Sequence, residues 1–232
     1  MLKPIIVLTV LCNLLWLMQC TFSKAAREIP DDQRVTYRPL YEEPRFQEPL
    51  RFAALDYPRL HAAMFYATNA VRVRHDVAPL TSHPLLEQAA WRYALRMAEK
   101  KFMAHVDPYA SAHLRTPEQR VRAAGVVNAR SAENLATYYG IQYQAPERVY
   151  RTPGQKGQFS RTRHGRPIPN HTYRSLAEGV VASWMSSPPH RANILSKNAL
   201  QLGCGAAFFR DEKGFPQFIL VQLYQWGEPV RP

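Results

Sequence analysis

The sequence predicts an α+β domain in which helices come first and a β-hairpin closes the chain. Apolar residues recur at helical spacing across 60–71 and again across 85–97. Near the carboxyl end, two alternating segments, 201–209 and 217–224, are joined by a polar turn, which is typical of an antiparallel hairpin. Helices followed by a terminal hairpin indicate a layered domain, either α+β or an α/β/α sandwich.

Local signals give the first three helices their boundaries. The first helix begins near Arg59, and the second begins at Ser82 or Pro84. A short third helix has Thr116 as its N-cap and Pro117 at its first position, where a missing N–H costs nothing.

A fourth helix has an apolar residue every fourth position across 176–184. Pro188 and Pro189 follow, and we expect them to end this helix because proline donates no backbone N–H. His190 then lies on a stiffened segment between the helix end and the first strand of the hairpin. An imidazole held in that way is a candidate for ligand binding or proton transfer.

The amino terminus has the features of a cleaved secretory signal over residues 1–25. Lys3 provides a short positive region, residues 4–18 are almost wholly apolar, and Ser23 and Ala25 place small side chains at the spacing needed for cleavage. We therefore expect a secreted, extracellular or periplasmic protein.

Two other fates of this leader are weaker predictions. The apolar run is short for an uncleaved membrane anchor. Lipidation at Cys20 would make a lipoprotein, but bulky Gln19 stands where a small residue is expected. Cleavage would remove Cys12 and Cys20 and leave Cys204 as a buried apolar residue, so no internal disulfide is expected.

The remaining chain divides into a linker or surface strap rich in proline and charge, 26–58, and a domain, 59–226, with a basic insertion at 140–172. Lys and Arg number 30 against 18 Asp and Glu, giving a net charge of +12. This excess favours a lipid or anionic envelope surface as partner. No nucleic-acid partner is expected, because no RNA- or DNA-binding motif accompanies the charge.

Four polar or aromatic elements occur in order along the domain: Asn69 with Arg72, His105, Glu133 within Ala-Glu-Asn-Leu-Ala, and Trp184 followed by the run that starts at His190. Together they resemble the CAP superfamily, also called SCP-like, of cysteine-rich secretory proteins, antigen 5 and pathogenesis-related 1 proteins. The resemblance is to the bacterial type and covers most of the chain after the leader. It implies a three-layer α/β/α sandwich with a large cleft.

The resemblance also implies site residues. In many members the cleft holds two histidines and two acidic residues, and the histidines can bind a divalent metal such as zinc. His105 and His190 are similar to the two histidines, and Glu133 is similar to one acid. The run from His190 to Gly205 matches a family segment that ends in Gly-Cys-Gly.

The chain departs from the family at the second acid, where it has Ser187. Glu178 is the nearest acid upstream, but nine helical residues separate the two, so Glu178 faces about the opposite way. Ser187, Glu178 and Asn193, which belongs to a stretch that differs from the family pattern, are the remaining cleft candidates. We regard Asn69, Arg72 and Trp184 as structural.

The leading functional hypothesis is a non-enzymatic, monomeric extracellular binding protein whose cleft takes a divalent cation. Only two protein ligands, His105 and His190, predict modest zinc affinity, since catalytic zinc usually has three. One alternative is a metal-assisted hydrolase of ester or peptide bonds, with Glu133 as the catalytic base. Another is an adhesive module that binds lipid or the cell envelope.

Overall fold

The computed structural model describes residues 43–126, 130–152 and 157–226, which all belong to one compact unit, Thr36–Pro232. The expected leader at 1–25, with Cys20, lies outside the described residues, as does the first part of the linker. Within the described part of the chain, no helix has the length and apolar character needed to cross a bilayer.

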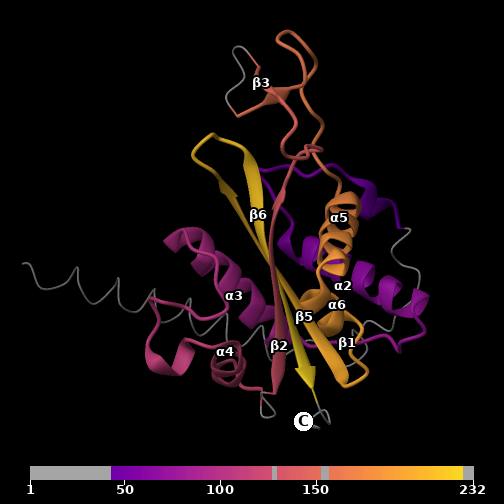
Figure 1. The fold of residues 1–232 in the computed structure, drawn as a ribbon, viewed down its shortest axis with the longest axis vertical. Helices are drawn as coiled ribbons and strands as arrows, with labels where there is room; N and C mark the ends of the chain where they lie inside the picture. Colours follow the sequence, from indigo (N-terminus) through magenta and orange to yellow (C-terminus); the bar gives the residue numbers. More distant parts are fainter. Residues whose placement is uncertain (1–42, 127–129, 153–156, 227–232) are drawn as a thin grey trace, which may run out of the picture. The chain divides into compact units, whose positions relative to one another are not determined.

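The sheet has four strands in the order β1-β5-β6-β2. Their bounds are Thr81–Ser82 for β1, Ser131–Tyr139 for β2, Ala199–Arg210 for β5 and Pro216–Trp226 for β6. β1 runs parallel to β5, and the other two pairings are antiparallel. The expected hairpin is therefore β5–β6, and it forms the centre of the sheet (Figure 1).

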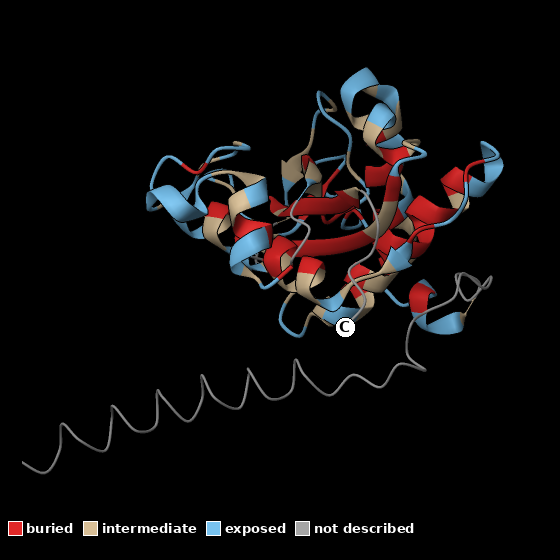
Figure 2. Ribbon diagram, turned by 90° about the horizontal axis from the view of Figure 1, so that it is seen from below, coloured by how far each residue is buried: buried red, intermediate tan, exposed pale blue. Residues whose placement is uncertain are grey.

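Helices cover both faces of this sheet. α3 and α4 lie on one side, and α2, α5 and α6 lie on the other (Figure 1). Their bounds are Tyr57–Arg74 for α2, Pro84–Lys100 for α3, Pro117–Ala123 for α4, Tyr173–Ser186 for α5 and Pro188–Ile194 for α6, with short 3-10 turns η3 at Pro44–Gln47 and η4 at Ala112–Leu114. Buried residues concentrate on the sheet and on the helix faces against it (Figure 2). The predicted α/β/α sandwich with a terminal hairpin is confirmed.

Helix α3 lies directly against β5 because two glycines leave room for it. A Cβ atom added to Gly203 would lie 2.2 Å from the Glu87 nitrogen, and one added to Gly205 would lie 2.2 Å from the Trp91 nitrogen. Both contacts are with backbone, which has no rotamer to change. The Gly-Cys-Gly sequence is therefore a packing requirement, and Cys204 between the glycines is fully buried, so its thiol has a strongly raised pKa.

Helix α6 corrects one expectation. Pro188 and Pro189 do not simply end the preceding helix; they occupy the first turn of a new one, with Ser187 as the N-cap. The first-turn N–H groups of a helix have no intrahelical acceptor, so prolines are tolerated there. His190 thus lies on a helix rather than on an extended linker.

Asn69 and Arg72 of α2 have structural roles, as expected. Asn69 exchanges two hydrogen bonds with the backbone of Leu80, at 2.8 and 3.0 Å. The buried Arg72 guanidinium donates to the carbonyls of Ile194 and Ser196, at 2.6 and 2.9 Å. Arg72 therefore connects the first helix to the carboxyl end of α6.

The insertion 140–172, here called the arm, has a small core of its own. It contains the two-residue strands β3, Tyr150–Arg151, and β4, Phe159–Ser160. Phe159 stacks on Phe215 of the β5–β6 turn with ring centroids 3.8 Å apart. The arm is thus a packed extension beyond one end of the sheet (Figure 1).

Substituting Gly205→Ala tests the close approach of α3 to β5. We expect a loss of unfolding free energy of about 1–3 kcal/mol, the usual cost of overpacking, because backbone must move. Urea denaturation followed by circular dichroism measures it. The control is Gly165→Ala, whose added Cβ meets chiefly the rotatable Thr162 side chain. Equal stability of the two variants would contradict the packing argument.

Candidate functional site

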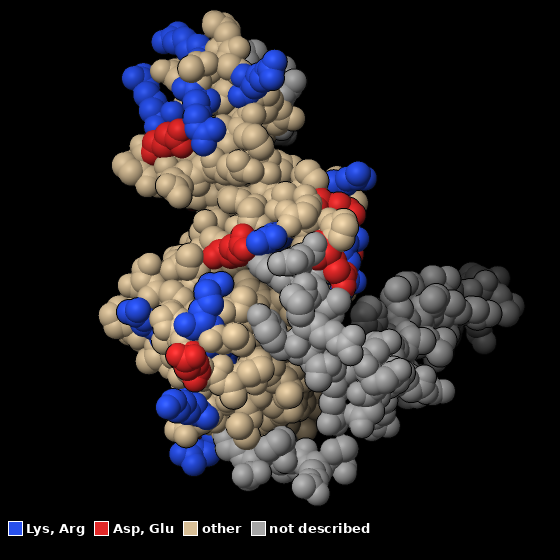
Figure 3. Space-filling model, turned by 90° about the vertical axis from the view of Figure 1, so that its right-hand side faces the viewer, with Lys and Arg blue, Asp and Glu red and all other residues tan. Residues whose placement is uncertain are grey.

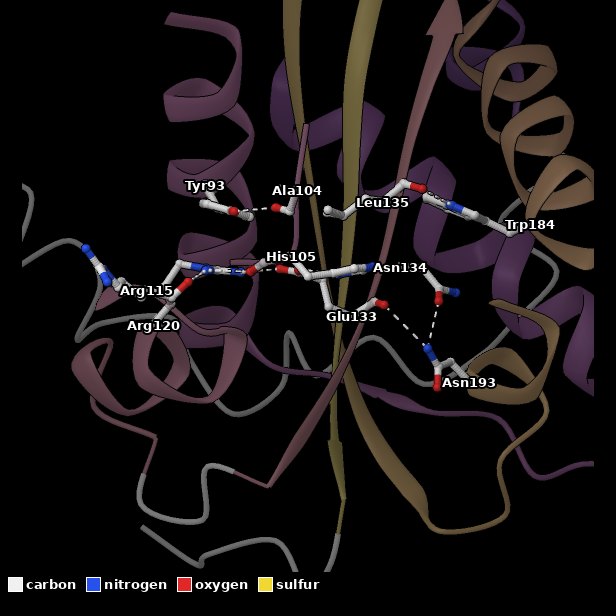
Figure 4. A network of polar contacts seen from close by, with 10 residues as sticks. All are labelled: Tyr93, Ala104, His105, Arg115, Arg120, Glu133, Asn134, Leu135, Trp184 and Asn193. Atoms are coloured by element: carbon white, nitrogen blue, oxygen red, sulfur yellow. Dashed lines mark hydrogen bonds and ion pairs between the residues drawn. The ribbon is translucent and has the colours of Figure 1, made fainter. Parts of the chain in front are cut away.

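His105 lies on the loop that leaves α3. Lys101 ends that helix in a left-handed conformation, with φ of 54°. The hydroxyl of the buried Tyr93 donates to the carbonyl of Ala104, which fixes the backbone immediately before His105 (Figure 4). Burial raises the pKa of Tyr93 to about 12, so this hydroxyl remains a donor at any physiological pH.

Glu133 lies on β2, and its carboxylate forms a hydrogen bond with His105. Ala-Glu-Asn-Leu-Ala, for which no helix or strand was predicted, belongs to an edge strand paired with β6. The Glu133 side chain is 1% exposed, and its two oxygens bind different partners. Oε1 lies 2.8 Å from His105 Nδ1, and Oε2 accepts from Arg120 Nη2 at 2.7 Å (Figure 4).

Arg120 of α4 is a site residue that the sequence analysis missed. Its guanidinium lies 3.4 Å from the centre of the Tyr93 ring. It donates to the carbonyl of His105 at 3.2 Å and to that of Arg115 at 2.6 Å. A partial signal was available: the capping box at Thr116 fixes where α4 begins and hence where Arg120 points. Arg120 thereby holds Glu133 and the His105 backbone together.

His190 and Asn193 approach the same strand from α6. Asn193 Nδ2 donates to Asn134 Oδ1 at 2.8 Å and to the Glu133 carbonyl at 3.4 Å, and Asn134 donates to the His190 carbonyl at 3.2 Å. Residues three apart share a helix face, so His190 lies on the face of α6 that carries Asn193. The structure thus gathers His105, Glu133, His190 and Asn193 around one strand.

Ser187 and Glu178 do not join this group. Ser187 links α5 to α6, and its backbone N–H donates to the Trp184 carbonyl at 3.1 Å. Glu178 is exposed, binds Arg174 at 3.1 Å and lines a separate cavity of about 540 Å³ between α2 and α5. The buried Trp184 is structural, as expected, and donates to the Leu135 carbonyl at 3.0 Å.

A buried network of uncharged hydrogen-bonding side chains holds β2 in place behind the site. Asn134 Nδ2 donates to Gln222 Oε1 at 3.1 Å, and Gln222 Nε2 donates to Thr68 Oγ1 at 2.7 Å. The Tyr224 hydroxyl donates to the same Gln222 oxygen at 2.6 Å. All four side chains are buried, so this network links β2 through β6 to α2 without any unpaired charge.

The two histidines have opposite electrostatic environments. The hydrogen bond to Glu133 raises the pKa of His105 above its ordinary value, against the opposing effect of burial. Burial, and then the charge of His105, lower the pKa of His190. Near neutral pH, His105 therefore holds a proton more readily than His190.

The residues present would offer a divalent cation two imidazole ligands, His105 and His190. A neutral His105 that donates from Nδ1 to Glu133 keeps the lone pair of Nε2 for a metal, the usual arrangement of a carboxylate-supported ligand. His190 supplies a second imidazole. Both Glu133 oxygens are already bound, so this carboxylate orients His105 rather than ligating. In the described ranges, no cluster of three or more His, Cys, Asp or Glu side chains is close enough to hold a metal.

Comparison with models of known families identifies the family of this chain. The model of the cysteine-rich secretory protein family, CAP, matches residues 65–224, more than half of the chain. This protein belongs to the CAP family. No curated protein sequence matches it significantly. The family model spans the elements that carry His105, Glu133 and His190.

Three of the solved structures similar to this CAP protein come from bacteria. An extracellular SCP-domain protein of Bacillus anthracis is 18% identical, with 78% of this chain and 45% of that chain covered and a TM-score of 0.49. An outer surface protein of Borrelia burgdorferi is 14% identical, with 72% and 92% covered and a TM-score of 0.42. A cysteine-rich secretory protein of Staphylococcus aureus is 18% identical, with 73% and 40% covered and a TM-score of 0.39. This chain therefore spans less than half of the first and third of these proteins.

Titration of the two imidazoles by NMR tests the site electrostatics. In metal-free protein, we expect a His105 pKa above the ordinary value of about 6.5 and a His190 pKa below it. Because the folded-state pKa of His105 is raised, the stability from its pairing with Glu133 is fully present below about pH 6.5 and is lost as pH rises through the raised value. Glu133→Gln should lower the His105 pKa. Identical titration of His105 in both proteins would contradict the assignment.

Proposed function

We propose that this CAP protein acts outside the cytoplasm as a non-enzymatic binding protein, and that His105 and His190 hold a divalent cation, most suitably zinc. The hydrogen bond between His105 Nδ1 and the buried Glu133 carboxylate carries this proposal. It fixes the imidazole orientation and leaves Nε2 on a side chain that is 53% exposed. A bound cation would supply positive charge and open coordination positions for an oxygen ligand.

The contacts around the two histidines preorganise the proposed cation site. Arg120 neutralises Glu133 and binds the His105 carbonyl, so the imidazole has little freedom before a cation arrives. Asn134 binds the His190 carbonyl and Asn193, which orients α6 toward β2. Sites supported in this way lose less entropy on binding.

The contacts of Glu133 favour binding over hydrolysis. A general base must reach a water molecule that contacts the substrate. The Glu133 side chain is almost fully buried, and both of its oxygens accept hydrogen bonds from His105 and Arg120. Glu133 therefore suits a positioning role better than proton abstraction.

We propose a second contact, between the arm and a lipid or anionic envelope surface. Arg148, Arg163 and Arg166 are exposed and make no ion pair with any described acid. The guanidinium carbons of Arg148 and Arg163 lie 5.5 and 5.9 Å from the centre of the Tyr150 ring. Basic side chains gather on this end of the molecule (Figure 3). An aromatic ring beside unpaired arginines suits the interface of an anionic membrane.

Calorimetric zinc titration tests the cation site. We expect one zinc per chain, and at least tenfold weaker binding in His105→Ala and in His190→Ala, since each removes one of two protein ligands. The control is His113→Ala, which removes an exposed histidine on η4. No zinc binding by the unmodified protein, or an equal loss in the control, would refute the proposed site.

Vesicle sedimentation tests the arm. The variant Arg148→Gln/Arg163→Gln should bind vesicles rich in phosphatidylserine roughly tenfold or more weakly at low salt, since each arginine near such a surface contributes about 1 kcal/mol. The control Arg74→Gln/Arg122→Gln changes net charge equally but lies outside the arm. Equal losses in both variants would show a diffuse charge effect and contradict a role for the arm.

A further inference from the structure

A second cavity, of about 480 Å³, lies between α3 and α4 beneath the segment 107–114. Its volume is within the range of about 300 to 1,000 Å³ typical of small-molecule sites. His105, Glu133 and His190 do not line it, so the cation site does not account for it.

Aromatic rings form one wall of this cavity. Tyr93 of α3 and Tyr109 of the covering segment both line it. Phe102 stands between them, in edge-to-face contact with each ring at centroid distances of 6.2 and 5.5 Å. Tyr109 is 62% exposed, so part of this aromatic surface faces solvent. Aromatic pairs prefer edge-to-face or offset stacking, so the exposed ring of Tyr109 suits contact with a further aromatic ring.

Exposed apolar side chains concentrate at the same place. Among the described residues, most of the large apolar side chains that face solvent lie on the single segment 103–114: Met103, Val106, Tyr109 and Leu114. Tyr109 and Leu114 line the cavity itself. Exposed apolar surface gathered around a hollow marks a binding site more often than apolar residues scattered singly.

One of the arginines around the cavity has no acidic partner among the described residues. Three arginines line it, and buried carboxylates satisfy two of them: Arg96 binds Asp107, and Arg120 binds Glu133. Arg92, one turn of α3 before Arg96, is exposed, and its guanidinium makes no hydrogen bond or ion pair with any described residue. A ligand with an acidic group would therefore find an unpaired guanidinium beside an aromatic wall.

We propose that this cavity binds a small aromatic carboxylate, with its ring against Tyr109 and its acid group on Arg92. Arg120 lines the cavity and also binds Glu133, so the cavity shares a wall with the His105–Glu133 pair. Binding here is independent of any metal, but it is detectable at His105 through this shared arginine.

Calorimetry of the full chain with 3-phenylpropionate tests the proposal. The neutral analogue 3-phenylpropanol tests the acid group, and 3-cyclohexylpropionate tests the ring. We expect one site per chain, at least fivefold weaker binding of each analogue, and at least a tenfold loss in Arg92→Gln. Saturating ligand should also shift the His105 ring resonances of metal-free protein.

A matched variant separates this cavity from the one between α2 and α5. Arg74→Gln removes an exposed arginine that lines the latter cavity, and it should leave affinity unchanged. Absence of binding, a greater loss in Arg74→Gln than in Arg92→Gln, or equal affinity for the neutral analogue would overturn the proposal. His105→Ala should leave the affinity unchanged, because His105 does not line the cavity.

Discussion

The buried ion pair between Arg120 and Glu133 is the interaction on which the site depends. The side chains are only 8% and 1% exposed, so each charge requires the other in a region that water does not reach. The pair joins α4 to the edge strand β2, and Arg120 extends this connection to the His105 backbone and to Tyr93. Three elements that are separate in sequence thereby meet around one carboxylate.

Much of the fold could be predicted because its signals are local. Apolar periodicity identified the long helices, and alternation identified the terminal hairpin; Thr116 marked the start of α4 through its own side chain. These features depend on residues within one or two turns of each other. His105 and Glu133 could be found only through family resemblance, since neither stands out by spacing alone.

The features that were missed depend on distant partners. β2 has an irregular burial pattern and is recognisable as a strand only through its pairing with β6. Arg120 resembles any solvated arginine on a short helix, and its burial follows from Glu133, which lies 13 residues away. The double proline before His190 fits a helix start as well as a helix end, and the contacts between α6 and β2 decide which applies.

Strand β2 also fixes the distance between the candidate site and the arm. Glu133 lies near its beginning, and Tyr139, the last residue of β2, stacks edge-to-face with Phe215 and Tyr143 beside the arm. Six residues of extended chain span about 20 Å. Both ends are held by nine residues of unbroken pairing with β6, so this distance is rigid. A protein held to a surface by its arm would therefore present Glu133, and the His105 imidazole bound to it, at a constant distance from the arm.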